Sequence, residues 1–209
     1  MITHEGYGVY VNLEDIFLGK LYDVYQLYAS GDFSKVKSSP YLTALFIGSH
    51  GENYYSGTLQ QIIDSAPNLS SIILFLPTGI SGNISVLSSL NNLTRLVIFD
   101  ERTSSNIVGT LSSVGSLINL TSLALCQTAV TGSIEDFVEA QVAAGRTSGT
   151  CNFDIRIQSF TLNNEYITIP GQYALKITYT ASTVTLSANG STLATYNTSN
   201  QTWTYQQQT

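Results

Sequence analysis

One apolar pattern, repeated four times, dominates the middle of this 209-residue chain. Four stretches carry the spacing L-x-x-L-x-L, and their leading residues, 27, 24 and 27 positions apart, are Leu42, Leu69, Leu93 and Leu120. A second pattern follows each stretch in phase and reads SGTL, SGNI, VGTL and TGSI. Self-similarity at a period of about 20 to 50 residues is typical of stacked repeating units. The sequence therefore predicts a stack in which each unit contributes one strand.

The two patterns together resemble a leucine-rich repeat, in the S-G-x-I variety found in plant extracellular proteins. The best match is LTSLALCQTAVTGSI, residues 120–134, and the resemblance covers about residues 39–145. It implies a parallel sheet of short strands, each followed by a turn and a return through a helix or extended segment, with the leucines inward. The family's asparagine after each strand is missing, since the corresponding residues are His50, Pro77, Glu101 and Thr128.

The segment before the repeats has a different pattern. Behind Asn12, a good N-cap, apolar residues at helical spacing predict a helix that extends to Tyr28. The S-G-x-apolar step then recurs at Ser30. We interpret residues 1–38 as an N-terminal cap or degenerate repeat, because the end of a repeat stack must cover its core.

The repeats end in a longer helix and a strand. Ser133 and Asp136 predict a capping box that begins the helix, and Gly145 predicts its end. Alternating apolar residues from Cys151 predict a strand that extends the parallel sheet. We therefore assign residues 39–157 to the repeats.

Residues 158–209 have an all-β pattern. Short alternating strands follow from about residue 166, and Asn189-Gly190 predicts a hairpin turn. The predicted fold class is thus α/β: a short leucine-rich-repeat solenoid with a parallel sheet, a helical N-terminal cap and a C-terminal antiparallel β-domain.

The positions between the leucines point to the outer face of the predicted sheet. Large apolar side chains recur there, together with one cation; we call these six residues the outer patch, and they are Phe46, Ile73, Phe75, Arg95, Val97 and Phe99. Adjacent strands lie about 4.8 Å apart, so these side chains should form rows. Either the C-terminal domain or the N-terminal cap covers the rows as a second core, or the rows bind another chain or a ligand.

Composition excludes several classes of function. The formal net charge is -6, and the 8 Lys and Arg residues are scattered, so we expect no nucleic-acid partner. The uncharged stretch between Asp64 and Arg95 is interrupted by Pro and Gly, so we expect no membrane insertion. The start of the chain has no basic and apolar leader. Cys126 and Cys151 either pair or stay as buried thiols.

The sequence offers no convergent set of catalytic groups. It contains two His residues and no nucleotide-binding glycine loop, so we expect no enzyme, no metal and no cofactor. Ser49, His50 and Glu52 are close in sequence but point apart on an extended chain. In the same loop, Tyr54 and Tyr55 are candidates for stacking on a glycan.

The expected function is that of a non-enzymatic protein-binding or structural module. Low charge and abundant neutral polar residues resemble the composition of virion proteins, such as phage head or tail appendages, which are made in the host cytoplasm. Assembly through the outer patch would give a homo-oligomer or a complex with a protein partner. The alternative is a bacterial surface or secreted adhesin that binds glycan or host protein through its loops.

Overall fold

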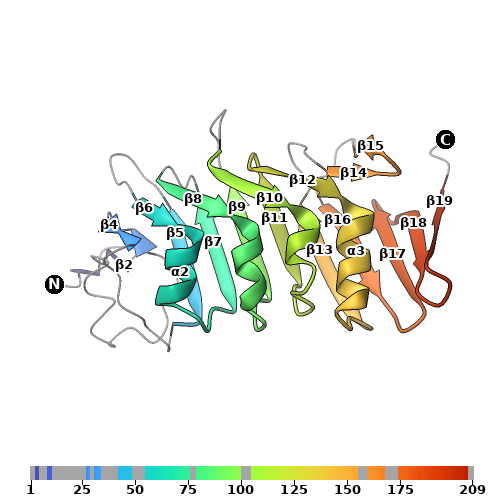
Figure 1. Ribbon diagram of the computed structural model, residues 1–209, viewed down its shortest axis with the longest axis horizontal. Coiled ribbons are helices and arrows are strands. Elements are labelled where there is room, and N and C mark those ends of the chain that lie inside the picture. The colour runs from blue at the N-terminus through green and yellow to red at the C-terminus, as the bar shows by residue number, and fades with distance from the viewer. Residues whose placement is uncertain are drawn as a thin grey trace.

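The computed structural model describes residues 3–4, 9–10, 27–28, 31–33, 42–48, 55–75, 79–99, 105–154, 160–167 and 174–206. In these residues the protein is a mixed α/β structure with one large sheet of mostly parallel strands, one smaller sheet and few helices. Figure 1 shows the helices in a row in front of the large sheet. The large sheet is open, since its first and last described strands do not pair.

The large sheet has twelve strands. Its central parallel strands are β5 (Ala44–Gly48), β7 (Ser71–Phe75), β9 (Arg95–Phe99), β11 (Ser122–Cys126) and β13 (Gly149–Asp154). On one side the sheet continues through β3 (Leu27–Tyr28), β2 (Val9–Tyr10) and β1 (Thr3–His4). On the other side it continues through antiparallel β16 (Ala174–Tyr179), β17 (Thr183–Ala188), β18 (Ser191–Asn197) and β19 (Thr202–Tyr205).

The smaller sheet has seven strands. In spatial order they are β15 (Glu165–Tyr166), β14 (Phe160–Leu162), β12 (Ala129–Ser133), β10 (Ile107–Thr110), β8 (Ile80–Asn83), β6 (Tyr55–Thr58) and β4 (Gly31–Asp32). Helical segments follow four of these strands: α2 (Leu59–Ser65), 3-10 segments η2 (Ile84–Ser89) and η3 (Leu111–Val114), and α3 (Ile134–Ala143). Each unit therefore passes from a large-sheet strand to a small-sheet strand and then to a helical segment.

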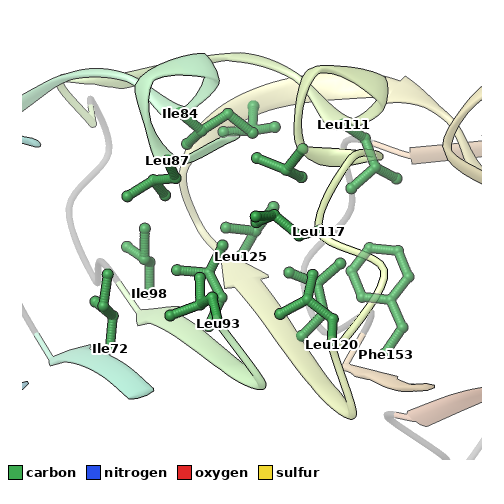
Figure 2. Close-up of a cluster of buried hydrophobic side chains, with 14 of the residues drawn as sticks. Ile72, Ile84, Leu87, Leu93, Ile98, Leu111, Leu117, Leu120, Leu125 and Phe153 are labelled. Atoms are coloured by element: carbon green, nitrogen blue, oxygen red, sulfur yellow. The ribbon is translucent and has the colours of Figure 1, made fainter. Parts of the chain in front are cut away.

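The spaced leucines fill the interior, as the repeat pattern predicts. All twelve predicted inward residues of β5, β7, β9, β11 and their leading positions are at most 4% exposed. Side chains of the helical segments complete this core; in Figure 2, Leu87 lies above Ile98, and Leu117 lies above Leu120. The core is continuous because every unit stacks its apolar residues on those of the next.

The glycines of the S-G-x-I step share one backbone conformation. The φ angles of Gly57, Gly82, Gly109 and Gly132 are 138°, 130°, 130° and 129°. L-residues rarely adopt this region, so glycine is required wherever the chain turns from the small-sheet strand into the helical segment. At Gly109 a Cβ atom would also lie only 2.5 Å from Asn83 Oδ1 of the preceding unit. The step is thus a steric requirement of the stack.

Hydroxyl side chains join successive units at the start of the large-sheet strands. The hydroxyls of Ser70, Thr94 and Thr121 each donate, at 3.0 Å, to the backbone carbonyl of the equivalent residue one unit earlier. The backbone N–H groups of the same residues donate to the same carbonyls. The recurrent Asn-Leu-Ser/Thr triplets of the sequence therefore have a structural role at their third position.

Helix α3 agrees with its predicted limits, and it shows one of the two hydrogen bonds of its predicted capping box. Ser133 Oγ accepts a hydrogen bond from the Asp136 backbone N–H at 3.1 Å, and Gly145 follows the helix with φ 97°. The reciprocal bond of a capping box, from the Ser133 backbone N–H to the Asp136 side chain, is absent among the described contacts. The Ser133 hydroxyl donates to Glu135 Oε2 at 2.9 Å. This carboxylate holds a position in the first helical turn, where the helix dipole favours negative charge.

The structure corrects the C-terminal end of the helix that the sequence predicts before the repeats. Tyr28 lies in strand β3, which pairs with β2 and β5, whereas the sequence predicts that the helix extends to this residue. Residues 11–26, which hold the rest of that predicted helix, lie outside the described part of the chain. β3 and β4 join the two sheets in the same order as the later units do.

The C-terminal strands form the predicted meander, including the Asn189-Gly190 turn with φ angles of 53° and 77°. They do not fold over the large sheet. β16 pairs with β13 through six residue pairs, from Gly149–Tyr179 to Asp154–Ala174, and so extends the same sheet at its edge. The two sets of strands therefore share one outer face.

Candidate outer-face binding site

The predicted rows of the outer patch are confirmed by the register of the sheet. Phe46 pairs with Ile73, which pairs with Val97, and Phe75 pairs with Phe99. The ring centroids of Phe46 and Phe75 are 5.6 Å apart, and those of Phe75 and Phe99 are 6.1 Å apart, with tilted planes. Three strands thus hold a continuous aromatic contact on one face.

The outer patch is partly open to solvent. Phe75 is 39% exposed, one of the most exposed large apolar side chains among the described residues. Phe46, Ile73, Val97 and Phe99 are half-buried. Since the C-terminal strands extend the sheet edgewise, they leave this face uncovered; whether a partner binds there stays a prediction.

A groove runs beside the patch over the next strands. It has a volume of about 310 Å³, and its lining residues include Phe75, Val97 and Phe99 on one side and Asn152 and Asp154 on the other. Arg95 also lines it and is exposed. An apolar floor with a few polar groups at the rim is the usual composition of a binding surface.

The apolar character ends where the antiparallel strands begin. One row of the outer face consists of threonines in register on adjacent strands: Thr150, Thr178, Thr185, Thr195 and Thr204. Threonine suits an exposed strand position because its branched side chain packs on the pleat while its hydroxyl meets water. The outer patch is therefore confined to the parallel strands β5, β7 and β9.

The two cysteines do not form a disulfide with each other. Both are buried thiols, Cys126 beside the outer-face groove and Cys151 in the core. The register of β11 and β13 aligns Cys151 with Thr121, so Cys126 lies about 16 Å farther along the strand direction, beyond disulfide reach. Burial raises the pKa of the Cys151 thiol to about 11, although the neighbouring Arg146 guanidinium opposes this shift.

A buried arginine next to Cys151 is a feature that the sequence analysis missed. Arg146 is 5% exposed, its Nη1 donates to Gln141 Oε1 at 2.8 Å, and its Cζ lies 4.1 Å from the ring centroid of Tyr179. Gln141 Nε2 in turn donates to the Leu117 carbonyl. The arginine follows the C-terminal end of α3, where the helix dipole and the tyrosine ring both stabilise a cation. Its position after the helix-ending Gly145 is the only sequence clue.

The remaining predicted contacts are not tested by the geometry. Ser49, His50, Glu52 and Tyr54 lie outside the described residues, and only the backbone of Tyr55 is described, in β6. In the described part of the chain, no group of three or more His, Cys, Asp or Glu side chains is placed to hold a metal ion. No helix there has the length and apolar content that a membrane span requires.

Comparison of the chain with protein-family models, with curated proteins and with solved structures finds no match. The assignment of a function therefore rests on the sequence and on the geometry of the sites.

Proposed function

We propose that this protein is a non-enzymatic protein-binding and structural module that assembles through the outer patch. The observation that carries the proposal is the contact of Phe46, Phe75 and Phe99 along a face that no described segment covers. Interface cores are rich in aromatic residues and poor in charge. In the patch, Arg95 is the only charged residue.

The occupant that we favour is a second copy of the chain. Cyclic dimers with a two-fold axis are the commonest oligomers, and they bring the same patch of both subunits together. Apolar rings opposite apolar rings satisfy that requirement, and all the acidic residues of the chain lie outside the patch. The association would bury the exposed surface of Phe75 and its neighbours. Burial of apolar surface contributes about 25 cal/mol of favourable free energy per Å².

We further propose that residues 39–157 form a short leucine-rich-repeat solenoid. Its support is the burial of every spaced leucine, the parallel pairing of β5 to β13, and the shared conformation of the S-G-x-I glycines. The unit length of 24 to 27 residues also falls within the range of that repeat.

The setting that we propose is a virion, with a phage head or tail appendage as the model. The support is compositional: charged residues make up only 11% of the chain, and most of its polar side chains are the neutral ones of Ser, Thr, Asn and Gln. The alternative is a bacterial surface or secreted adhesin that binds glycan or host protein through its loops.

The first test is the solution mass of the purified protein by size exclusion coupled to light scattering, compared with the 22.6 kDa of one chain. We expect a defined oligomer. Phe75→Asp should weaken the association at least about 30-fold, since loss of an interface anchor costs about 2 kcal/mol or more. The matched control is Val108→Asp, because Val108 is 42% exposed but lies on the smaller sheet.

Two outcomes contradict self-assembly through the patch. If Val108→Asp dissociates the oligomer as strongly as Phe75→Asp, the effect comes from added charge and not from the patch. If the wild-type chain is a monomer at every concentration, no second copy occupies the patch.

A further inference from the structure

A second groove lies between the β14–β15 hairpin and the last two strands of the large sheet. These elements are at the C-terminal end of the molecule in Figure 1. Its volume is about 390 Å³, within the usual range of small-molecule sites. The residues used below are Asn163, Glu165 and Tyr166 on one wall and Tyr205 and Gln206 on the other. We propose that this groove binds a neutral oligosaccharide.

One carboxylate fixes both walls of the groove. Glu135 Oε1, in the first turn of α3, accepts hydrogen bonds from the Asn163 backbone N–H and from the Tyr205 hydroxyl, the latter at 3.0 Å. Its Oε2 accepts from the Ser133 hydroxyl at 2.9 Å. The hairpin and the last strand are far apart in sequence, so this shared acceptor holds them in one geometry. A pre-organised site loses less entropy when a ligand binds.

Aromatic rings, together with Leu162, Ile167 and Leu193, form the apolar part of the groove. Tyr166 is 70% exposed and Tyr205 is 37% exposed, so both rings are accessible to a ligand. Trp203 stacks on Tyr205 with centroids 6.2 Å apart and planes at 14°, and its Nε1 donates to Glu139 at 2.8 Å. This stack holds the Tyr205 ring in place, and the exposed Tyr166 ring provides a second aromatic surface on the opposite wall. Flat aromatic surfaces suit the C–H face of a pyranose ring.

The polar groups and charges decide the class of ligand. Among the described residues, no Lys or Arg lines the groove, so phosphate, sulfate and carboxylate ligands would lack a partner there. The side chains of Asn163 and Gln206 offer both donors and acceptors, and Glu165 offers acceptors. The Tyr205 hydroxyl is already committed as a donor to Glu135, and burial and this bond raise its pKa to about 12. A neutral sugar, with uncharged hydroxyls around an apolar ring face, fits a groove that has amide groups and aromatic rings but no Lys or Arg among its described lining residues.

The chain carries its own reporter for the test, because Trp203 is its single tryptophan and stacks on a groove wall. Its fluorescence is measured during titration with cellohexaose, maltohexaose and chitohexaose, each up to about 10 mM, the range of weak binding. We expect a saturable change with at least one of them. Tyr166→Ala should lower the affinity at least about tenfold, and circular dichroism should show an intact fold because the side chain is largely exposed.

Glu165→Gln and Val108→Ala complete the design. Glu165→Gln keeps an acceptor and should change the affinity for a neutral sugar less than about threefold, whereas Val108→Ala, remote from the groove, should change nothing. Three results would overturn the proposal: no saturable change with any of the three sugars, binding that Tyr166→Ala leaves intact, or a groove that instead binds tetramethylammonium and loses it in Glu165→Gln.

Discussion

At the scale of single residues, the S-G-x-I glycines show how the stack restricts the sequence. Gly82 and Gly109 have the same φ of 130°, but their surroundings differ. A Cβ at Gly82 would lie 3.5 Å from its nearest neighbour, Leu59 N, an ordinary contact. A Cβ at Gly109 would lie 2.5 Å from Asn83 Oδ1 and 3.0 Å from Ile84 Cγ1. An alanine at Gly82 would therefore introduce backbone strain alone, whereas an alanine at Gly109 would introduce the same strain and a steric overlap.

We predict that Gly109→Ala lowers the free energy of unfolding more than Gly82→Ala does. Backbone strain alone costs about 1 to 3 kcal/mol at either position, and the overlap adds to it at Gly109. Urea denaturation of the two variants and the wild-type chain measures the difference. Equal losses would mean that Asn83 moves aside without cost.

The buried thiol of Cys151 predicts a pH dependence of stability. Its folded pKa of about 11 is raised from 9.0, so its contribution is fully present below pH 9 and is lost as the pH rises toward 11, where the unfolded chain ionises first. The loss is on the order of 2 to 3 kcal/mol for a shift of this size. Urea denaturation between pH 8 and 11 should show a steeper decline for the wild-type chain than for Cys151→Ala. Parallel curves for the two proteins would contradict the assignment.

At the scale of elements, helix caps differ from one unit to another. Thr58 forms a full capping box at α2: its Oγ1 accepts from the Gln61 N–H at 3.2 Å, and Gln61 Oε1 accepts from the Thr58 N–H at 2.8 Å. Thr110 holds the equivalent place before η3 but its side chain makes no cap hydrogen bond.

We therefore expect Thr58→Ala to cost about 1 kcal/mol of unfolding free energy and Thr110→Ala clearly less. Thermal denaturation of both variants is the measurement. A loss at Thr110 as large as that at Thr58 would indicate that the methyl group, and not the cap, stabilises these positions.

At the scale of the whole molecule, the C-terminal strands and the repeats form one sheet. β16 pairs with β13, and the inner side of the meander also contacts the end of the repeat core, through Tyr179 over Arg146 and Trp203 to Glu139. Buried residues of the meander belong to the same apolar cluster as the repeat leucines, among them Leu175, Ile177, Val184 and Leu186.

We predict that residues 158–209 do not fold by themselves. Without β13 and α3, the strands would expose one edge and their whole apolar face, and so small a chain segment buries little surface. The isolated fragment should show no cooperative thermal transition by circular dichroism, and the full chain should show one transition. A cooperative transition of the fragment would support a separate C-terminal domain instead.

The sequence predicted the local parts of this fold well because those parts depend on periodicity. The alternation of strand residues fixes which side chains point inward, so the burial of Ile72 and Leu96 and the row of Phe75 and Phe99 were both readable. The helix after Ser133 and the turn at Asn189 were predicted from local chemistry in the same way.

Contacts between distant segments were not readable from these patterns. The groove walls meet only because Glu135 binds both Asn163 and Tyr205, and no spacing in the sequence relates these residues. Arg146 carries no sequence mark of burial, since a charged residue after a helix is usually solvated.

The sequence alone thus determined the repeat period, the inward leucines and the rows of the outer patch, because side-chain direction along a strand depends only on position. The tertiary structure alone decided that the last strands extend the sheet and leave the patch open. Their alternating pattern buries the same apolar side, Leu175 and Ile177 included, whether they cover the sheet face or continue its edge. Only the pairing of β16 with β13 distinguishes the two arrangements.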